Sequence, residues 1–280
     1  MLTMSGRKPF RLLHSEWKWL NPPSAEPISL TEAKLQLRRT AQFVVEDATI
    51  QRQIEAARNA VEADTCRALC WQRWKLTLDE WPDVWELYRC PVIAVESVKY
   101  NDFTTPTAVQ VTVDPATYKV SLSEPARIQP AFTKYWLPPR PELASVEVVF
   151  TAGYLIPFTV SVAADTLTFT DYTPTNGDYF RLSNSGGTLP AGLSPGVTYY
   201  IVGSSGHTCQ LAASSGGAAI DLVDTGTGQH FLGTMPGGIY RALLQHVATQ
   251  FADREGSDAA AKCETSYLQA LRSVQYTGGV

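Results

Sequence analysis

The chain has 280 residues, of which 44% are hydrophobic and 18% are charged, and its formal net charge at pH 7 is −4. This composition is typical of a soluble globular protein with one large domain or two ordinary ones, and the negative balance excludes the overall basic footprint of a nucleic-acid-binding protein. No apolar run approaches the roughly 20 residues that a membrane-spanning helix needs, so we expect no contact with a membrane.

The first 27 residues predict an extended arm. No periodic pattern is present, and Pro22, Pro23 and Pro27 favour extended backbone. The N-terminus also lacks the apolar core of a secretory signal, so we expect synthesis and use inside the cell. Trp17 and Trp19 leave two interpretations open. They pack locally on the domain, or they anchor the arm on a partner protein, because large aromatic side chains are frequent interface anchors.

A helix is predicted to begin at Ser29. Ser29 and Glu32 have the spacing of a capping box, in which each side chain accepts a hydrogen bond from the backbone N–H of the other residue. Ala33, Leu35 and Leu37 supply the apolar surface of this helix.

A longer helix is predicted over residues 46–69. One stripe is apolar at three- and four-residue steps, formed by Ile50, Ile54, Ala57, Val61 and Ala68. The opposite face is charged and includes Arg52, Arg58 and Glu62. Cys66 and Cys70 lie four residues apart on the same helix. They are interpreted as small buried thiols rather than metal ligands, because no two further ligands are evident.

Alternation with a period of two predicts short strands between residues 74 and 150, each with one covered face. The apolar residues that mark them are Trp74, Leu76, Leu78, Val92, Val95, Val98, Val109, Val111, Val113, Tyr118, Val120, Ile128, Val146, Val148 and Phe150. We therefore expect a central antiparallel β part.

The composition changes near residue 158. Residues 159–235 are rich in Gly, Ser and Thr and poor in Lys, Arg and Glu. Strands are predicted at 166–170, 179–182, 198–202, 208–211 and 229–232, and Gly-containing turns separate them. This segment is predicted to be a small all-β module inserted into the rest of the protein.

Helical periodicity returns after Pro236. Ile239, Leu243, Val247 and Phe251 are spaced by four, which predicts a helix with one apolar stripe. Gly256 and Ser257 break this pattern. A last helix is predicted beyond them, with Cys263, Tyr267, Leu271 and Val274 on one side.

The predicted fold class is α+β, with N- and C-terminal helices forming a helical bundle, a central antiparallel β part and the inserted module. The predicted boundaries are 1–27 for the arm, 28–157 plus 236–276 for the core, 159–235 for the module and 277–280 for a flexible tail.

No motif for catalysis or cofactor binding is present. The sequence has no H-E-x-x-H, no G-x-S-x-G and no phosphate-binding glycine loop before a helix. A metal at His207 and His230 would need a third ligand, and His246 is interpreted as a packed or interfacial residue. Five cysteines at scattered positions argue against a disulfide framework. We expect no enzyme activity and no cofactor.

An ordered set of segments resembles one known family. It comprises Pro22-Pro23, Glu26-Pro27, Leu30-Thr-Glu-Ala-Lys34, Leu37-Arg38, Ala56-Ala-Arg58, Val61-Glu62, Arg67-Ala-Leu69, Trp74, Leu78-Asp-Glu-Trp-Pro82, Pro91-Val92, Val95, Val98, Tyr100, Tyr118, Pro125-Ala-Arg-Ile128, Trp136, Phe150-Thr-Ala-Gly153 and the helix at 242–254. Together these resemble the head–tail connector (adaptor) proteins of tailed bacteriophages, over residues 22–157 and 236–275. The segment 159–235 departs from the family pattern, since core members pass almost directly from the Ala-Gly-Tyr strand to the closing helix.

The resemblance implies a structural role in the virion, at the head–tail junction, after synthesis in the bacterial cytoplasm. Such proteins form rings, typically of twelve copies, under the portal protein. They extend the DNA channel without sequence specificity and present a docking surface to tail proteins such as a tail terminator, nozzle or tail-completion protein. The inserted module would face outward on the ring or contact tail proteins.

Candidate interface residues follow from this reading. The arm and tail offer Trp17, Trp19, Tyr267, Leu271 and Tyr276 as anchors for the portal or tail. Arg52, Arg58 and Glu62 on the charged helix face are candidates for lateral contacts between subunits.

Two other classes of function remain open at this stage. One is a tail or baseplate structural protein whose β module binds carbohydrate, although the module lacks the Trp that usually stacks on sugars. The other is a hydrolase that uses paired carboxylates, which no spacing in the sequence supports.

Overall fold

The computed structural model describes residues 15–253, except residues 41, 43, 83, 84, 105, 106 and 108. The described chain has the α+β class that the sequence predicts. Its α-helices are α1 Leu30–Gln36, α2 Asp47–Thr65 and α3 Gly237–Asp253. Its strands are β1 Ser15–Asn21, β2 Gln72–Leu78, β3 Trp85–Leu87, β4 Val92–Asn101, β5 Gln110–Thr112, β6 Tyr118–Ser121, β7 Ala126–Pro130, β8 Val146–Ala152, β9 Ile156–Ser161, β10 Thr166–Thr168, β11 Tyr179–Ser185, β12 Thr198–Ser205, β13 Thr208–Ala212 and β14 Gln229–Leu232.

The chain divides into two compact units, and each is built from separated segments. The sheet unit comprises Met1–Leu20, Arg73–Leu87 and Val92–Thr151. The helix–barrel unit comprises Asn21–Gln72, Tyr88–Pro91 and Ala152–Val280. The three α-helices and the strands from β9 to β14 therefore belong to one unit. The predicted boundaries at residues 159 and 235 stay a prediction.

The sheet unit contains two sheets. One has five strands in the order β1-β2-β8-β4-β5, and the other has three strands in the order β3-β7-β6. The alternation read from the sequence is confirmed in β2, where Trp74, Leu76 and Leu78 are buried and the residues between them are half-buried. β8 is buried on both faces along most of its length, as expected for a strand in the middle of the order.

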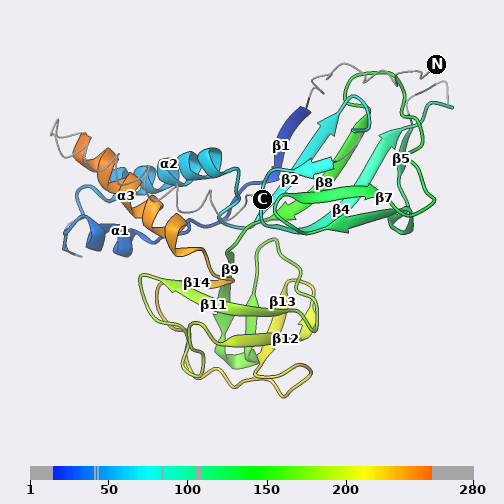
Figure 1. Ribbon diagram of the computed structural model, residues 1–280. Helices are drawn as coiled ribbons and strands as arrows, with labels where there is room; N and C mark the ends of the chain where they lie inside the picture. The colour runs from blue at the N-terminus through cyan, green and yellow to red at the C-terminus, as the bar shows by residue number, and fades with distance from the viewer. Residues whose placement is uncertain are drawn as a thin grey trace, which may run out of the picture. The chain divides into compact units, whose positions relative to one another are not determined.

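The three helices of the helix–barrel unit share one apolar core, which confirms the predicted helical bundle (Figure 1). α1 contributes Ala33, α2 its stripe from Ile50 to Val61, and α3 the predicted residues spaced by four. α3 begins 201 positions after the end of α1, so the core joins the two ends of the described chain.

Two details of α2 differ from the sequence prediction. The helix ends at Thr65, because Cys66 takes a left-handed conformation (φ 53°) and its N–H bonds to the Glu62 carbonyl. Cys66 is consequently exposed, whereas Cys70 is buried as expected. Arg58 and Glu62 are each only 5% exposed, so the prediction that they lie on a solvent-facing charged face is wrong.

The apolar surface of α1 also differs from the prediction. Leu35 is 77% exposed, and its neighbour Lys34 is buried with its Nζ atom 2.5 Å from Asp47 at the start of α2. α1 has only two turns, so its burial is set by contact with α2 rather than by a full helical period. The predicted apolar residue Leu35 is therefore exposed, while the charged Lys34 is buried in an ion pair between the two helices.

The strands from β9 to β14 form a closed barrel with the strand order β10-β13-β12-β11-β14-β9. All of its strand pairs are antiparallel. Its last strand, β14, has the bounds that the sequence predicts, and each of the other predicted strands overlaps an observed one. The barrel also includes β9, which begins at Ile156. Among the described residues, none of the helices is long and apolar enough to cross a membrane.

Candidate interaction surfaces

A buried polar junction ties the barrel to the first helix. Ser29 caps α1 by accepting a hydrogen bond from the Glu32 N–H at 3.2 Å, which confirms half of the capping box. The Ser29 N–H does not bond to Glu32. It donates to the Ser185 Oγ atom of β11 at 2.7 Å, and the Ser185 hydroxyl donates to the Glu32 carboxylate. A hydroxyl from the barrel thus completes the cap of a helix 156 positions earlier in the chain.

The same junction includes the start of α3. The Tyr240 hydroxyl donates to the other carboxylate oxygen of Glu32, and burial together with this carboxylate raises the pKa of Tyr240. The close approach needs glycine next to Ser185. Gly186 has φ 74°, and a Cβ atom there would lie 2.1 Å from the Ser29 Oγ atom. The barrel, α1 and α3 are therefore held by specific contacts rather than by chain connection alone.

Two of the predicted interface residues belong to a second buried cluster. Arg58 donates to both carboxylate oxygens of Glu26, at 2.9 and 3.2 Å, and its NH1 atom lies 3.5 Å from Glu62. Glu62 accepts from the Leu69 N–H at 2.8 Å and from the Gln72 amide at 2.6 Å. Arg58 thus binds Glu26, in the segment before α1. Glu62 binds Leu69 and Gln72, in the segment after α2.

The charges of this cluster act on one another. Burial raises the pKa of Glu62, and the Leu69 N–H and Arg58 partly oppose that rise. Burial lowers the pKa of Arg58, but the hydrogen bond and the charge of Glu26 outweigh burial, so that pKa rises. The hydrogen bonds and opposite charges around each side chain offset part of the cost of burying its charge.

The remaining predicted residues have three different positions. Trp17, on β1, is half-buried and makes edge contacts with Trp74 and Phe150 at 6.4 and 6.1 Å between ring centroids. Trp19 is exposed, although its ring lies 5.2 Å from that of Trp74. Arg52 is exposed on α2. Local packing therefore accounts for Trp17, while Trp19 and Arg52 remain accessible to a partner. Tyr267, Leu271 and Tyr276 lie outside the described residues.

The sequence did not single out a long irregular loop between β7 and β8, in the sheet unit. Its Trp136 stacks on Trp81 at 4.6 Å with the rings 9° from parallel. The Trp81 indole N–H donates to the Leu137 carbonyl at 2.6 Å, and Asp79 accepts from the Ala144 N–H at 2.8 Å. The loop is therefore fixed at several points although it has no regular secondary structure.

This anchored loop presents apolar side chains to solvent. Phe132 is 95% exposed, and the other exposed apolar residues of the loop are Tyr135, Leu137 and Leu143. Rigid loops that expose aromatic side chains are favourable for binding proteins, because little conformational entropy is lost on association. We refer to residues 131–143 as the aromatic loop.

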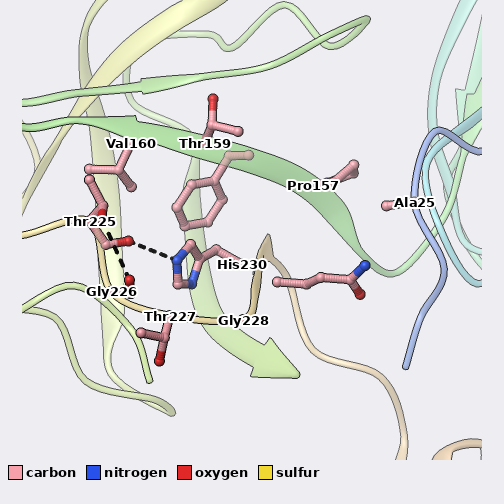
Figure 2. Close-up of a pocket in the computed structure, with 11 residues that line it drawn as sticks. Ala25, Pro157, Thr159, Val160, Thr225, Gly226, Thr227, Gly228 and His230 are labelled. Atoms are coloured by element: carbon pink, nitrogen blue, oxygen red, sulfur yellow. Dashed lines mark hydrogen bonds between the residues drawn. The ribbon is translucent and has the colours of Figure 1, made fainter. Parts of the chain in front are cut away.

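The barrel has a pocket of about 410 Å³ between β9 and the segment before β14. Figure 2 shows Pro157, Thr159 and Val160 on one side, and Thr225, Gly226, Thr227 and Gly228 on the other, with Ala25 at one end. No Asp, Glu, Lys or Arg lines it. The pocket would therefore accept a neutral group rather than an ion.

His230 is the titratable residue of this pocket, and its contacts fix its role. Its Nε2 atom donates to the Thr225 carbonyl at 2.9 Å, and its Nδ1 atom accepts from the Asn184 amide at 2.9 Å. Its ring stacks on Phe158 at 5.6 Å. Burial lowers its pKa, which keeps the ring neutral, and both nitrogens are engaged within the barrel. His230 thus holds residues 225–228 against β14 through its bond to Thr225. Neither of its ring nitrogens is available to act as a base.

The other polar residues do not form a metal site. The His207 Nδ1 atom lies 2.9 Å from the Tyr172 carbonyl. Within residues 15–253, apart from the seven undescribed positions, no group of three or more His, Cys, Asp or Glu side chains could hold a metal ion.

Comparison with known proteins gives a limited likeness. No family model matches the chain, and none of the curated proteins matches it. The chain is similar to a chain from the neck of an empty gene transfer agent (GTA) particle computed with C6 symmetry, at 24% identity and TM-score 0.41, over 50% of this chain and 71% of that one. A chain from the virion of a native GTA particle gives 24% identity and TM-score 0.41, over 49% and 71%. A chain from the neck of a native GTA particle computed with C12 symmetry gives 22% identity and TM-score 0.40, over 50% and 70%. At these TM-scores the likeness does not establish a shared fold.

Proposed function

We propose that this chain is a structural head–tail adaptor of a tailed bacteriophage. In this role its copies form a ring under the portal, extend the DNA channel and offer a docking surface to the tail. The ring holds passing DNA without sequence specificity, and its action depends on geometry and not on a reaction. Twelve copies are expected from the family that the sequence resembles.

One observation supports the proposal above all others, namely the ordered sequence resemblance over residues 22–157 and 236–275. The two stretches are separated in sequence by the barrel segment. Ile239, Leu243 and Val247 of the second stretch nevertheless pack in the same core as Ile50 and Ile54 of the first. The arrangement suits a family in which these helices form one body and the barrel is an addition.

The surface of the described chain also suits an assembly subunit. The aromatic loop is fixed by Trp136 and Trp81 and exposes Phe132, so a partner can bind it with little loss of entropy. Trp19 and Arg52 are exposed and remain candidates for contacts with the portal or a neighbouring subunit. Closed rings need two different faces on each subunit, and this chain offers accessible side chains in both of its units.

The proposal is tested by mixing the purified chain with the portal protein of the same phage. We expect ring-shaped complexes in electron micrographs and cosedimentation of the two proteins. A chain that stays monomeric at all concentrations and shows no affinity for the portal would contradict the proposal.

A tail or baseplate protein with a carbohydrate-binding barrel is the second candidate, and the pocket beside His230 is the observation that favours it. The pocket is uncharged and has the Thr159, Thr225 and Thr227 side chains in its lining. Titration of the full chain with neutral oligosaccharides, followed by NMR, separates the two functions. Saturable shifts of the Gly226 and Gly228 amides support the second candidate, and their absence leaves the adaptor proposal as the better account.

A further inference from the structure

The barrel wall opens where strand β9 changes its neighbour. Residues 156–158 of β9 pair with β14, and residues 159–161 pair with β10 on the other edge. Continued in the same register, the first ladder would bring Gly228 opposite Val160. Thr227 instead exchanges backbone hydrogen bonds with Thr188, at 3.1 and 2.9 Å, which draws residues 227–228 away from β9. The pocket of about 410 Å³ fills the resulting gap (Figure 2).

The free edge of β9 carries the backbone groups of Val160. Along a strand, successive residues direct their N–H and C=O groups to opposite edges. Pro157 has no N–H, so the hydrogen-bonded pairs between β9 and β14 are those of its neighbours Ile156 and Phe158. Val160, two positions after Phe158, therefore directs its N–H and C=O toward the pocket. Within the described chain, no strand pairs with β9 on this side of Val160.

One side-chain atom of the pocket lining also lacks a partner. The Gln229 Oε1 atom is buried, and no donor among the described residues bonds to it. The threonine hydroxyls of the lining are engaged with the Thr168 carbonyl, the Gly226 carbonyl and the Thr188 hydroxyl. Both ring nitrogens of His230 are engaged as well. A buried acceptor without a donor costs about 1–3 kcal/mol, so the pocket favours a ligand that brings an N–H group.

The lining favours a peptide over a sugar or an ion. Phe158 and His230 are only 5% and 8% exposed, so neither ring offers a face on which a sugar can stack. No Asp, Glu, Lys or Arg lines the pocket, so a charged group would find no partner. An extended peptide supplies both N–H and C=O groups at the spacing that the edge of a strand requires.

We propose that this pocket binds an extended, uncharged peptide segment of a neighbouring virion protein, by strand addition to β9. Val160 exchanges backbone hydrogen bonds with the segment, and the Gln229 Oε1 atom accepts a further N–H. The inference rests on the proposed adaptor function and deepens it, because it gives the barrel the task of holding an extended arm of a partner protein.

The probe is a blocked hexapeptide of alternating Thr and Val, added to the full chain and followed by NMR. We expect saturable shifts of the Val160 and Gly228 amides, slower hydrogen exchange of the Val160 N–H, and a dissociation constant of about 1 mM or lower. The same peptide with every backbone nitrogen methylated is the control. It keeps the side chains and loses the N–H donors, so it should not bind.

Two substitutions test the groups that hold the segment. Val160→Pro removes an N–H that makes no bond to β10, so the melting temperature should stay near that of the wild type while peptide affinity falls about tenfold. Gln229→Leu removes the unpaired acceptor, so affinity should fall about threefold or more without loss of stability. Gln129→Leu, at an exposed position on β7, is the matched control and should bind like the wild type.

Strand addition is wrong if neither peptide binds, if the methylated peptide binds equally well, or if both pocket variants keep wild-type affinity. Neutral oligosaccharides that shift the Val160 and Gly228 amides when the peptide does not would also overturn it, in favour of the carbohydrate-binding barrel. The adaptor function is measured separately, by ring formation with the portal. Rings without peptide binding leave that function standing, and peptide binding without rings contradicts the adaptor function alone.

Discussion

At the scale of single residues, the molecule depends on polar groups that meet across long stretches of sequence. The Ser29 cap was predictable, because a capping box has a local spacing. Its second half was not, because the partner of the Ser29 N–H is Ser185. The burial of Arg58 could not be predicted from the sequence either, because its partner Glu26 lies before α1 in a segment without helical periodicity. Local patterns predict which groups need partners, and the tertiary fold decides which partners they find.

Replacing Ser185 tests the junction between the barrel and α1. Ser185→Ala removes the acceptor of the buried Ser29 N–H and the donor to Glu32. We expect the free energy of unfolding to fall by about 1–3 kcal/mol, because a buried N–H is left unpaired. Urea denaturation measures the change, and Ser205→Ala on an exposed part of β12 is the control. Equal stability of the two variants would show that the junction does not hold the barrel.

The neutral state of His230 predicts a dependence of stability on pH. Burial lowers its pKa in the folded protein, so on acidification the unfolded chain takes up a proton before the folded one does. Stability contributed by this residue is present above the ordinary histidine pKa of about 6.5 and is lost as the pH falls below it.

Thermal unfolding at pH 7.5 and pH 5.5 measures this effect. The wild type should lose more stability between these two values than His230→Gln does. His246, whose pKa burial also lowers, is present in both proteins and cancels in the comparison. An identical pH dependence of the two proteins would mean that His230 is not held neutral by the barrel.

At the scale of elements, alternation and helical periodicity were reliable where burial follows the local pattern. β14 and the apolar stripe of α3 match their predictions. α2 ends four residues early, because the left-handed turn at Cys66 depends on the path of the chain into β2 and not on the periodicity. The aromatic loop was missed for a related reason. The loop is fixed by the stacking of Trp136 on Trp81. These two residues lie 55 positions apart, so their contact leaves no periodic pattern in the sequence.

Two substitutions separate the anchor of the aromatic loop from its exposed surface. Trp136→Ala removes the stacked ring and should lower the free energy of unfolding by about 3 kcal/mol, as expected for loss of a packed aromatic side chain. Phe132→Ala removes a side chain that is almost fully exposed and should change stability by less than about 0.5 kcal/mol. Chemical denaturation measures both. Phe132→Ala should nevertheless weaken ring formation, and a variant that assembles normally would argue against the loop as an interface.

At the scale of the whole molecule, the sequence predicted the α+β class, which the structure confirms. The helices and the barrel belong to one compact unit, and the central sheets form the other. The reason is physical. The barrel differs from the helices in its content of Gly, Ser and Thr. Ser185 of the barrel and Tyr240 of α3 nevertheless both bind Glu32 of α1, and these contacts attach the barrel to the helices.

Cryo-electron microscopy of the intact phage particle is the most direct test of the role assigned to this chain. We expect a closed ring of copies on the axis between the portal and the first tail protein. Copies found elsewhere in the particle, or absent from it, would contradict the account.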